Sequence, residues 1–180
     1  MFDTTFSHTS DSNLTVPVPD ELVIQLLHDF DTVIRLNPEC KGYQLVSQLP
    51  ETTTEYKVED SLAFIPKKLW SGGVWYTAIY TIVEDGCDVT VKAPGGFTSV
   101  NHWRLLRLAE GQRKIQIVSE AKCSKTFASF VKKFLDNVHK TQQKAFQERL
   151  EDAANKGSNR PGVLRRTSSW PNKMTAQAMA

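Results

Sequence analysis

The stretch RKIQIVSEAKCSKTFASFVKKFLDNVHKTQQKAFQERLE, residues 113–151, changes its apolar spacing partway along. In its first part every second residue is apolar or small, and this period of two is typical of a strand with one covered face. From Lys125 to about Glu151 apolar residues recur every three or four positions, which predicts an amphipathic helix. A helix of roughly 25 residues is about 38 Å long, enough to lie across a whole sheet. The stretch therefore predicts a sheet covered by a long C-terminal helix.

Six segments upstream and within this stretch show strand-like alternation, and short turn sequences separate them. They are residues 43–49, 53–64, 73–83, 87–93, 98–108 and 113–123. Because the links are short, neighbouring strands are expected to be antiparallel. With an opening strand at residues 4–10, the pattern predicts an α+β fold with a seven-stranded antiparallel sheet.

The segment LLHDFDTVIRLNP, residues 26–38, places His28, Asp29 and Asp31 between two apolar runs. Two short helices fit here, the first starting near Pro19 and the second stopping at Asn37, because the acids favour helix starts and proline ends a helix. We expect Asp29 or Asp31 to cap the second helix. A metal site is a weaker interpretation, since a catalytic metal usually takes three protein ligands. A third interpretation places His28 at the mouth of a cavity.

Length and composition point to one domain. The 180 residues carry a net charge of +2, which gives no general attraction to nucleic acid or acidic membranes. No signal peptide and no membrane-spanning run is evident, so we expect a cytoplasmic protein without integral membrane association. Residues 1–152 are assigned to the folded domain and residues 153–180, which lack periodicity, to a disordered basic, Ser-rich tail.

Three scattered cysteines, Cys40, Cys87 and Cys123, form no CxxC pair. This spacing supports neither a disulfide framework nor a zinc site, and buried or half-buried free thiols are expected. A nucleophilic cysteine beside a histidine stays open as the minor alternative. No metal and no cofactor is expected.

The order of elements resembles the helix-grip fold of the START-like, or SRPBCC, superfamily over about residues 2–151. More closely, residues 16–38, 56–81 and 91–105 resemble an uncharacterised family of filamentous fungi within that superfamily, whose members carry similar LLHDHD…IRLNP and LW.G.V.YTA segments. The resemblance implies a curved sheet wrapped on the long helix around a cavity for lipids, sterols or polyketides. Some members of the superfamily only bind ligands, and others are aromatase/cyclases, so fold alone does not decide the activity.

Aromatic residues gather in the middle strands, and large aromatics with one polar atom suit an apolar pocket that must orient a ligand. In a grip fold some of them face the cavity, together with residues of the long helix. The expected ligand-binding residues are Trp70, Trp75, Tyr76, Tyr80, Trp103, Arg104, Phe130, Phe134 and Val138. Strand alternation places His102 and Arg104 opposite Asn101 and Trp103, and the sequence leaves open which pair points inward.

If the protein is an enzyme, acid/base assistance to a cyclisation, dehydration or isomerisation is expected. His102 is the first candidate to move the proton and Tyr56 the second. For His102 the competing interpretation is a surface or hydrogen-bonded sheet residue.

Two further segments attract attention. Residues 63–73, AFIPKKLWSGG, are either a lid with Trp70 as a plug or an ordinary hairpin connection. In the tail, Arg165 and Arg166 precede Ser168, and this segment resembles a basophilic kinase target.

Three functions remain from the sequence. The first is a binding protein for a small hydrophobic or amphipathic ligand, lipid-like or polyketide-like. The second is a cyclase or dehydratase of fungal secondary metabolism that uses the same cavity. The third is a non-catalytic interaction module, and the oligomeric state is not determined by any of these patterns.

Overall fold

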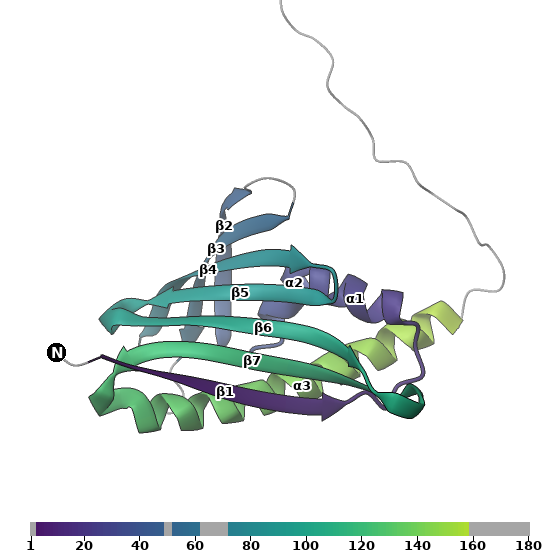
Figure 1. Ribbon diagram of the computed structural model, residues 1–180. Helices are drawn as coiled ribbons and strands as arrows, with labels where there is room; N and C mark the ends of the chain where they lie inside the picture. The colour runs from purple at the N-terminus through teal and green to yellow at the C-terminus, as the bar shows by residue number, and fades with distance from the viewer. Residues whose placement is uncertain (1–2, 49–51, 62–71, 159–180) are drawn as a thin grey trace, which may run out of the picture.

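The computed structural model describes residues 3–48, 52–61 and 72–158. Within this part of the chain, seven strands form one sheet (Figure 1). They are β1 (Asp3–Asn13), β2 (Cys40–Gln48), β3 (Thr53–Ser61), β4 (Gly73–Val83), β5 (Gly86–Ala93), β6 (Phe97–Arg107) and β7 (Arg113–Ser124). The α+β fold and the number of strands that the sequence predicts are confirmed.

The strand order β1-β7-β6-β5-β4-β3-β2 is a meander from β2 to β7 with β1 added beside β7. Every neighbouring pair is antiparallel. Side chains of one sheet face are buried in β7, whereas those of the other face are half-buried or exposed. This alternation fixes which residues point toward the helices.

Two short helices, α1 (Asp20–His28) and α2 (Phe30–Arg35), follow β1. The junction between them is as predicted, because the Asp29 side chain accepts a hydrogen bond from the backbone N–H of Thr32 and caps α2. His28 ends α1, and its Nε2 lies 2.9 Å from the carbonyl oxygen of Val83. No group of three or more metal-binding side chains is found within the described residues.

The long helix α3 (Ala128–Ser158) follows three short 3₁₀ turns, η1 (Pro94–Gly96), η2 (Ala109–Gly111) and η3 (Lys125–Phe127). It runs behind the sheet along β1 and β7 (Figure 1). It extends past the expected end at about Glu151, and residues 153–158, assigned from sequence to the tail, continue it. The reason is local, because Ala153 and Ala154 are strong helix formers and Ala154 also packs against the core.

The hydrophobic core lies between the sheet, α1, α2 and the C-terminal half of α3. From α3 it includes Phe146 and Leu150, both fully buried, and from the sheet it includes Trp103 and Leu105. Phe130, in the N-terminal half of α3, is 46% exposed. From α3, the core cluster therefore draws its fully buried members from the C-terminal half. Within the described residues, no helix is both long and apolar enough to cross a membrane.

Candidate ligand site on the helix-facing side of the sheet

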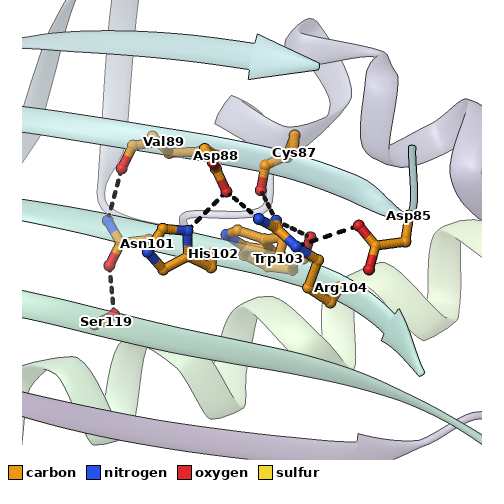
Figure 2. Close-up of polar contacts among 9 residues, drawn as sticks. All are labelled: Asp85, Cys87, Asp88, Val89, Asn101, His102, Trp103, Arg104 and Ser119. Carbon is orange, nitrogen blue, oxygen red and sulfur yellow. Dashed lines mark hydrogen bonds and ion pairs between the residues drawn. The ribbon is translucent and has the colours of Figure 1, made fainter. Parts of the chain in front are cut away.

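The two faces of the sheet are distinguished by β6. The ring of Trp103 lies 6.4 Å from that of Phe146 on α3, so Trp103 and the alternate residue Asn101 are on the helix-facing side. His102 and Arg104 are on the opposite, outer side (Figure 2). This answers the question that strand alternation left open: Asn101 and Trp103 point inward.

The outer side of β5 and β6 carries a compact charged cluster. Asp88 Oδ1 lies 2.8 Å from His102 Nδ1 and 2.6 Å from Arg104 Nη2, and Arg104 also pairs with Asp85 at 3.2 Å (Figure 2). Burial alone would raise the pKa of Asp88, but hydrogen bonds from His102 and Arg104 outweigh it, and the pKa is lowered. The cluster joins two neighbouring strands on their solvent side.

This placement corrects the expectation that His102 and Arg104 line an interior ligand site. Because they alternate with inward-pointing residues, their side chains leave the sheet on the side away from α3. Trp75 is also outside, 40% exposed, since it alternates with the inward-pointing Tyr76. His102 and the second acid/base candidate, Tyr56, therefore do not form one site.

A row of aromatic rings runs across the inner side of β2, β3 and β4. Phe30 of α2 contacts Tyr80 at 5.0 Å between ring centroids, Tyr80 meets Tyr56 edge-on at 5.7 Å, and Tyr56 meets Tyr43 edge-on at 5.8 Å. Edge-to-face contacts of this kind are favourable for aromatic pairs. Tyr80 is buried, whereas Tyr43 and Tyr56 are only half-buried. We name Tyr43, Tyr56 and Tyr80 the tyrosine row.

Tyrosine hydroxyls in this region are held in their neutral form. Burial raises the pKa of Tyr56, and the carboxylates of Asp31 and Asp29 raise it further. Burial likewise raises the pKa of Tyr80. At ordinary pH the row therefore offers neutral hydroxyl groups that can donate or accept hydrogen bonds.

Asp60, near the end of β3, is the buried acid of this side. It is 9% exposed, and its Oδ2 accepts hydrogen bonds from Asn37 Nδ2 at 2.7 Å and from Tyr76 Oη at 3.0 Å. Its Oδ1 is buried without a hydrogen-bond partner in the part of the chain that the structure describes. Burial raises the pKa of Asp60 to about 6, although the bonds from Tyr76 and Asn37 oppose the rise. An unpaired oxygen on a buried carboxyl is costly, and such groups are often found at functional sites.

A surface pocket of about 340 Å³ opens beside this carboxyl, and we name it the rim pocket. Asn37, which binds Asp60, and Tyr43, the outer member of the tyrosine row, both belong to its lining. The complete lining is Arg35, Asn37, Pro38, Cys40, Lys41, Gly42, Tyr43 and Arg149. The rim pocket, the tyrosine row and Asp60 together make up the candidate ligand site.

The space between β1, β7 and α3 is closed by a second set of polar side chains. Asn101 Nδ2 donates to the carbonyl of Val89, so Asn101 Oδ1 accepts from the hydroxyl of Ser119 (Figure 2). That hydroxyl in turn accepts from Nε2 of His139, 3.2 Å away. Burial lowers the pKa of His139 to about 4, and the nearby His8 adds to the lowering. His139 is therefore a neutral imidazole fixed in one tautomer.

The helix residues predicted to contact a ligand lie near the start of α3. Phe130 and Phe134 stack with ring centroids 6.5 Å apart, and Phe134 and Val138 are half-buried. Trp70 and Ser168 lie outside the described residues, as does most of the predicted lid. The roles proposed for them remain predictions.

The cysteines are free thiols, as predicted. Cys87 and Cys123 are buried and Cys40 is half-buried. Burial raises the pKa of all three thiols, to about 12 for Cys87. A raised pKa is the opposite of what a nucleophilic cysteine requires, since the thiolate is the reactive form.

The curved antiparallel sheet and the long C-terminal helix form a helix-grip fold, as in several solved structures. An aromatase/cyclase, Zhui, from Streptomyces sp. R1128 superimposes with a TM-score of 0.61 at 12% identity, covering 85% of this chain and 96% of that one. The di-domain ARO/CYC StfQ of the steffimycin biosynthetic pathway gives 0.67 at 9% identity over 84% and 52%. A START superfamily protein from Mycobacterium smegmatis gives 0.59 at 13% identity over 83% and 98%.

The chain belongs to the family described as Domain of unknown function (DUF7053), whose sequence profile matches residues 3–152. No curated protein matches the sequence. At such low identities the structural neighbours establish the fold, and the activity has to be argued from the site itself.

Proposed function

We propose that this protein binds a small hydrophobic or amphipathic molecule, lipid-like or polyketide-like, against the inner side of β2, β3 and β4. The observation that carries the proposal is Asp60, a buried carboxyl with one oxygen unpaired among the described residues, near the half-buried Tyr43 and Tyr56 of the tyrosine row. Ligand sites of this kind are mostly apolar, with a few polar groups that orient the ligand. The START-like fold supports the proposal as an analogy only.

The ligand would place its apolar body against the rings of Tyr43 and Tyr56. A hydroxyl or protonated group on it would donate to Oδ1 of Asp60, which receives no hydrogen bond from the described residues. Trp103, Phe134 and Val138 are retained as ligand-contact candidates from the sequence because they lie on the inner side or on α3. We expect this binding to take place in the cytoplasm.

The alternative is a cyclase or dehydratase, and Asp60 also favours it. A carboxyl with a pKa of about 6 exists in both protonation states near neutral pH, as a general acid or base requires. Tyr56 remains the second acid/base candidate. The resemblance to a filamentous-fungal family would place such an enzyme in secondary metabolism, which stays a prediction.

Native mass spectrometry of the full chain purified from its own cells tests the binding proposal. We expect a co-purifying compound of defined mass, which denaturation releases for identification. The matched variants are Tyr56→Phe, on the inner side, and Trp75→Phe, on the outer side, and only the former should alter retention. A bare protein mass, together with no thermal shift from a panel of lipids and polyketides, would contradict the proposal and favour the interaction module.

Asp60→Asn separates the binding protein from the enzyme. If the protein only binds, the variant should release the same compound, unchanged in mass, but less of it, because the amide N–H that replaces Oδ1 cannot accept a hydrogen bond from the ligand. If it is an enzyme, the variant should hold a substrate whose mass differs from the compound released by the wild-type chain. Release of the same compound from both proteins would therefore contradict the cyclase or dehydratase alternative.

A further inference from the structure

The rim pocket has an unusual charge. Its lining contains three cationic side chains, Arg35, Lys41 and Arg149, and no carboxylate. Like charges gathered around one cavity repel one another, and the repulsion is relieved when an anion binds between them. The composition of the pocket is thus a first indication of the charge of its occupant.

Two of the three cations have no ion-pair partner in the described part of the chain. Arg35 pairs with Asp31, 3.0 Å away on the same helix, through Nε. For Lys41 and Arg149, neither an ion pair nor a hydrogen bond is found among residues 3–48, 52–61 and 72–158, and both side chains are exposed. Two of the three cations therefore remain available for a ligand.

A second surface pocket provides the comparison. This groove of about 490 Å³ lies between β1 and α3, and its cations Lys140 and Lys144 are outnumbered by the acids Asp11, Glu148 and Glu151. Lys140 is in addition paired with Asp136 at 2.8 Å. The rim pocket therefore has an excess of cations that this second groove lacks.

The rim pocket also has an apolar wall. The guanidinium carbon of Arg35 lies 5.3 Å from the centroid of the Tyr43 ring, and the other edge of Tyr43 leads to Tyr56 in the tyrosine row. At Gly42, another lining residue, an added Cβ would meet no atom within 4 Å, so the space beside it is open. A ligand in this position would have its charge among the cations and its body along the tyrosines.

We propose that the ligand is an acidic amphiphile whose anionic group binds Lys41 and Arg149 in the rim pocket while its apolar body lies along the tyrosine row. This inference rests on the proposed function, because it names the class of the same ligand. A carboxylate, sulfonate or phosphate would each satisfy the cations, and Arg149 can bind any of them through two N–H groups.

Two fluorescent probes with the same aromatic body test the inference on the full chain. Anilinonaphthalene sulfonate carries an anionic group, and N-phenylnaphthylamine is its neutral counterpart. We expect the wild-type protein to bind the sulfonate about tenfold more tightly or better. The double variant Lys41→Gln/Arg149→Gln should lose that preference and bind the neutral dye within about twofold of wild type. Lys144→Gln, in the other groove, is the matched control and should change neither dye.

The outcomes distinguish a failure of the acidic amphiphile from a failure of the proposed function. If the neutral dye binds and the sulfonate binds no better, or if the double variant keeps the preference, the acidic amphiphile is wrong and the proposed function stands. If neither dye binds, the proposed function fails as well. Inorganic phosphate should compete only weakly, because it has no apolar body. If equimolar phosphate displaced the sulfonate, the inference of an amphiphile would be wrong, and the rim pocket would bind a free anion.

Discussion

Asp60 and His139 are both buried on the inner face of the sheet but lie toward opposite edges of it. Asp60 is on β3, beside β4, and His139 is on α3, beside β7. In both cases burial disfavours the charged form, so the pKa of the acid is raised to about 6 and that of the base is lowered to about 4. Their surroundings differ. Each has one buried atom without a hydrogen-bond partner among the described residues, Nδ1 of His139 and Oδ1 of Asp60, but the rim pocket adjoins Asp60, through Asn37, and not His139.

The difference separates a structural polar group from a candidate functional one. The chain from Val89 through Asn101 and Ser119 fixes the position and tautomer of His139, and Ser119 has no exposed surface. Asp60, which is 9% exposed, is connected through Asn37 to a pocket whose lining includes Arg35, Lys41 and Arg149. A perturbed pKa alone would have placed both groups in an active site.

The largest expected effect comes from His139. Its pKa is below the ordinary value of 6.5, so the unfolded chain takes up the proton first as the pH falls. The stability it contributes is complete above about pH 6.5 and is lost progressively toward pH 4, by about 3 kcal/mol. The free energy of unfolding in urea should therefore fall faster in wild type than in His139→Gln, in which the amide still donates to Ser119. A constant difference between the two proteins from pH 7 to pH 4 would contradict this.

Asp60→Asn tests the second buried group, whose contribution to stability depends on pH in the opposite direction. The pKa of Asp60 is raised from 3.8 to about 6, so its contribution to stability is complete below about pH 3.8 and is lost as the pH rises through 6. Removing the buried charge should stabilise the protein at pH 7.5 by about 2 kcal/mol, part of the gain being offset by an amide N–H without an acceptor. Urea unfolding at pH 7.5 and pH 4 measures it.

The control for this variant is Asp88→Asn on the outer face. The pKa of Asp88 is lowered, since the bonds from His102 and Arg104 outweigh burial, so this substitution should destabilise the protein at pH 7.5. Stabilisation by both substitutions, or by neither, would show that the two faces of the sheet do not differ as described.

Tyr76→Phe tests whether the raised pKa near neutrality belongs to Asp60, and its expected effect is smaller than that of Asp60→Asn. The hydroxyl of Tyr76 donates to Oδ2 of Asp60 at 3.0 Å and holds its pKa down, so removing it should raise that pKa by roughly a further half to one unit, about 1 kcal/mol. Titration of the carboxyl carbon by NMR measures the shift directly. Tyr80→Phe is the matched control and should leave the titration unchanged, because no hydrogen bond joins Tyr80 to Asp60 within the described residues.

Most of the fold could be predicted from the sequence because apolar residues recur every second position in the strands and every three or four positions in the long helix. The alternation around Ile115 and Ile117 and the switch to helical spacing after Lys125 give the sheet and its cover, and Asp29 marks the joint between the short helices. The end of α3 was harder to place. Its last residues lack large apolar side chains, and the helix propensity of Ala153 and Ala154, together with the packing of Ala154 against the core, extends it.

The site was less predictable because its polar members lie on apolar faces. Asp60 continues the alternation of Tyr56 and Val58, which places a carboxyl on the inner side of β3 and is a signal that could have been used. His139 likewise falls on the buried stripe of α3 between Leu135 and Phe146. The partners of these groups come from distant segments, and no local pattern shows them.

His102→Gln should have the smallest effect and decides whether the outer face has a role of its own. The imidazole is 30% exposed in its side chain and shares Asp88 with Arg104, which keeps its own bond to that carboxylate after the substitution. We expect a change in stability within about 0.5 kcal/mol, as is usual for partly exposed ion pairs, and unchanged affinity for N-phenylnaphthylamine. If the substitution instead weakened binding or abolished turnover, the ligand would have to contact the outer face. The assignment of the ligand site to the inner face, near Asp60, would then be wrong.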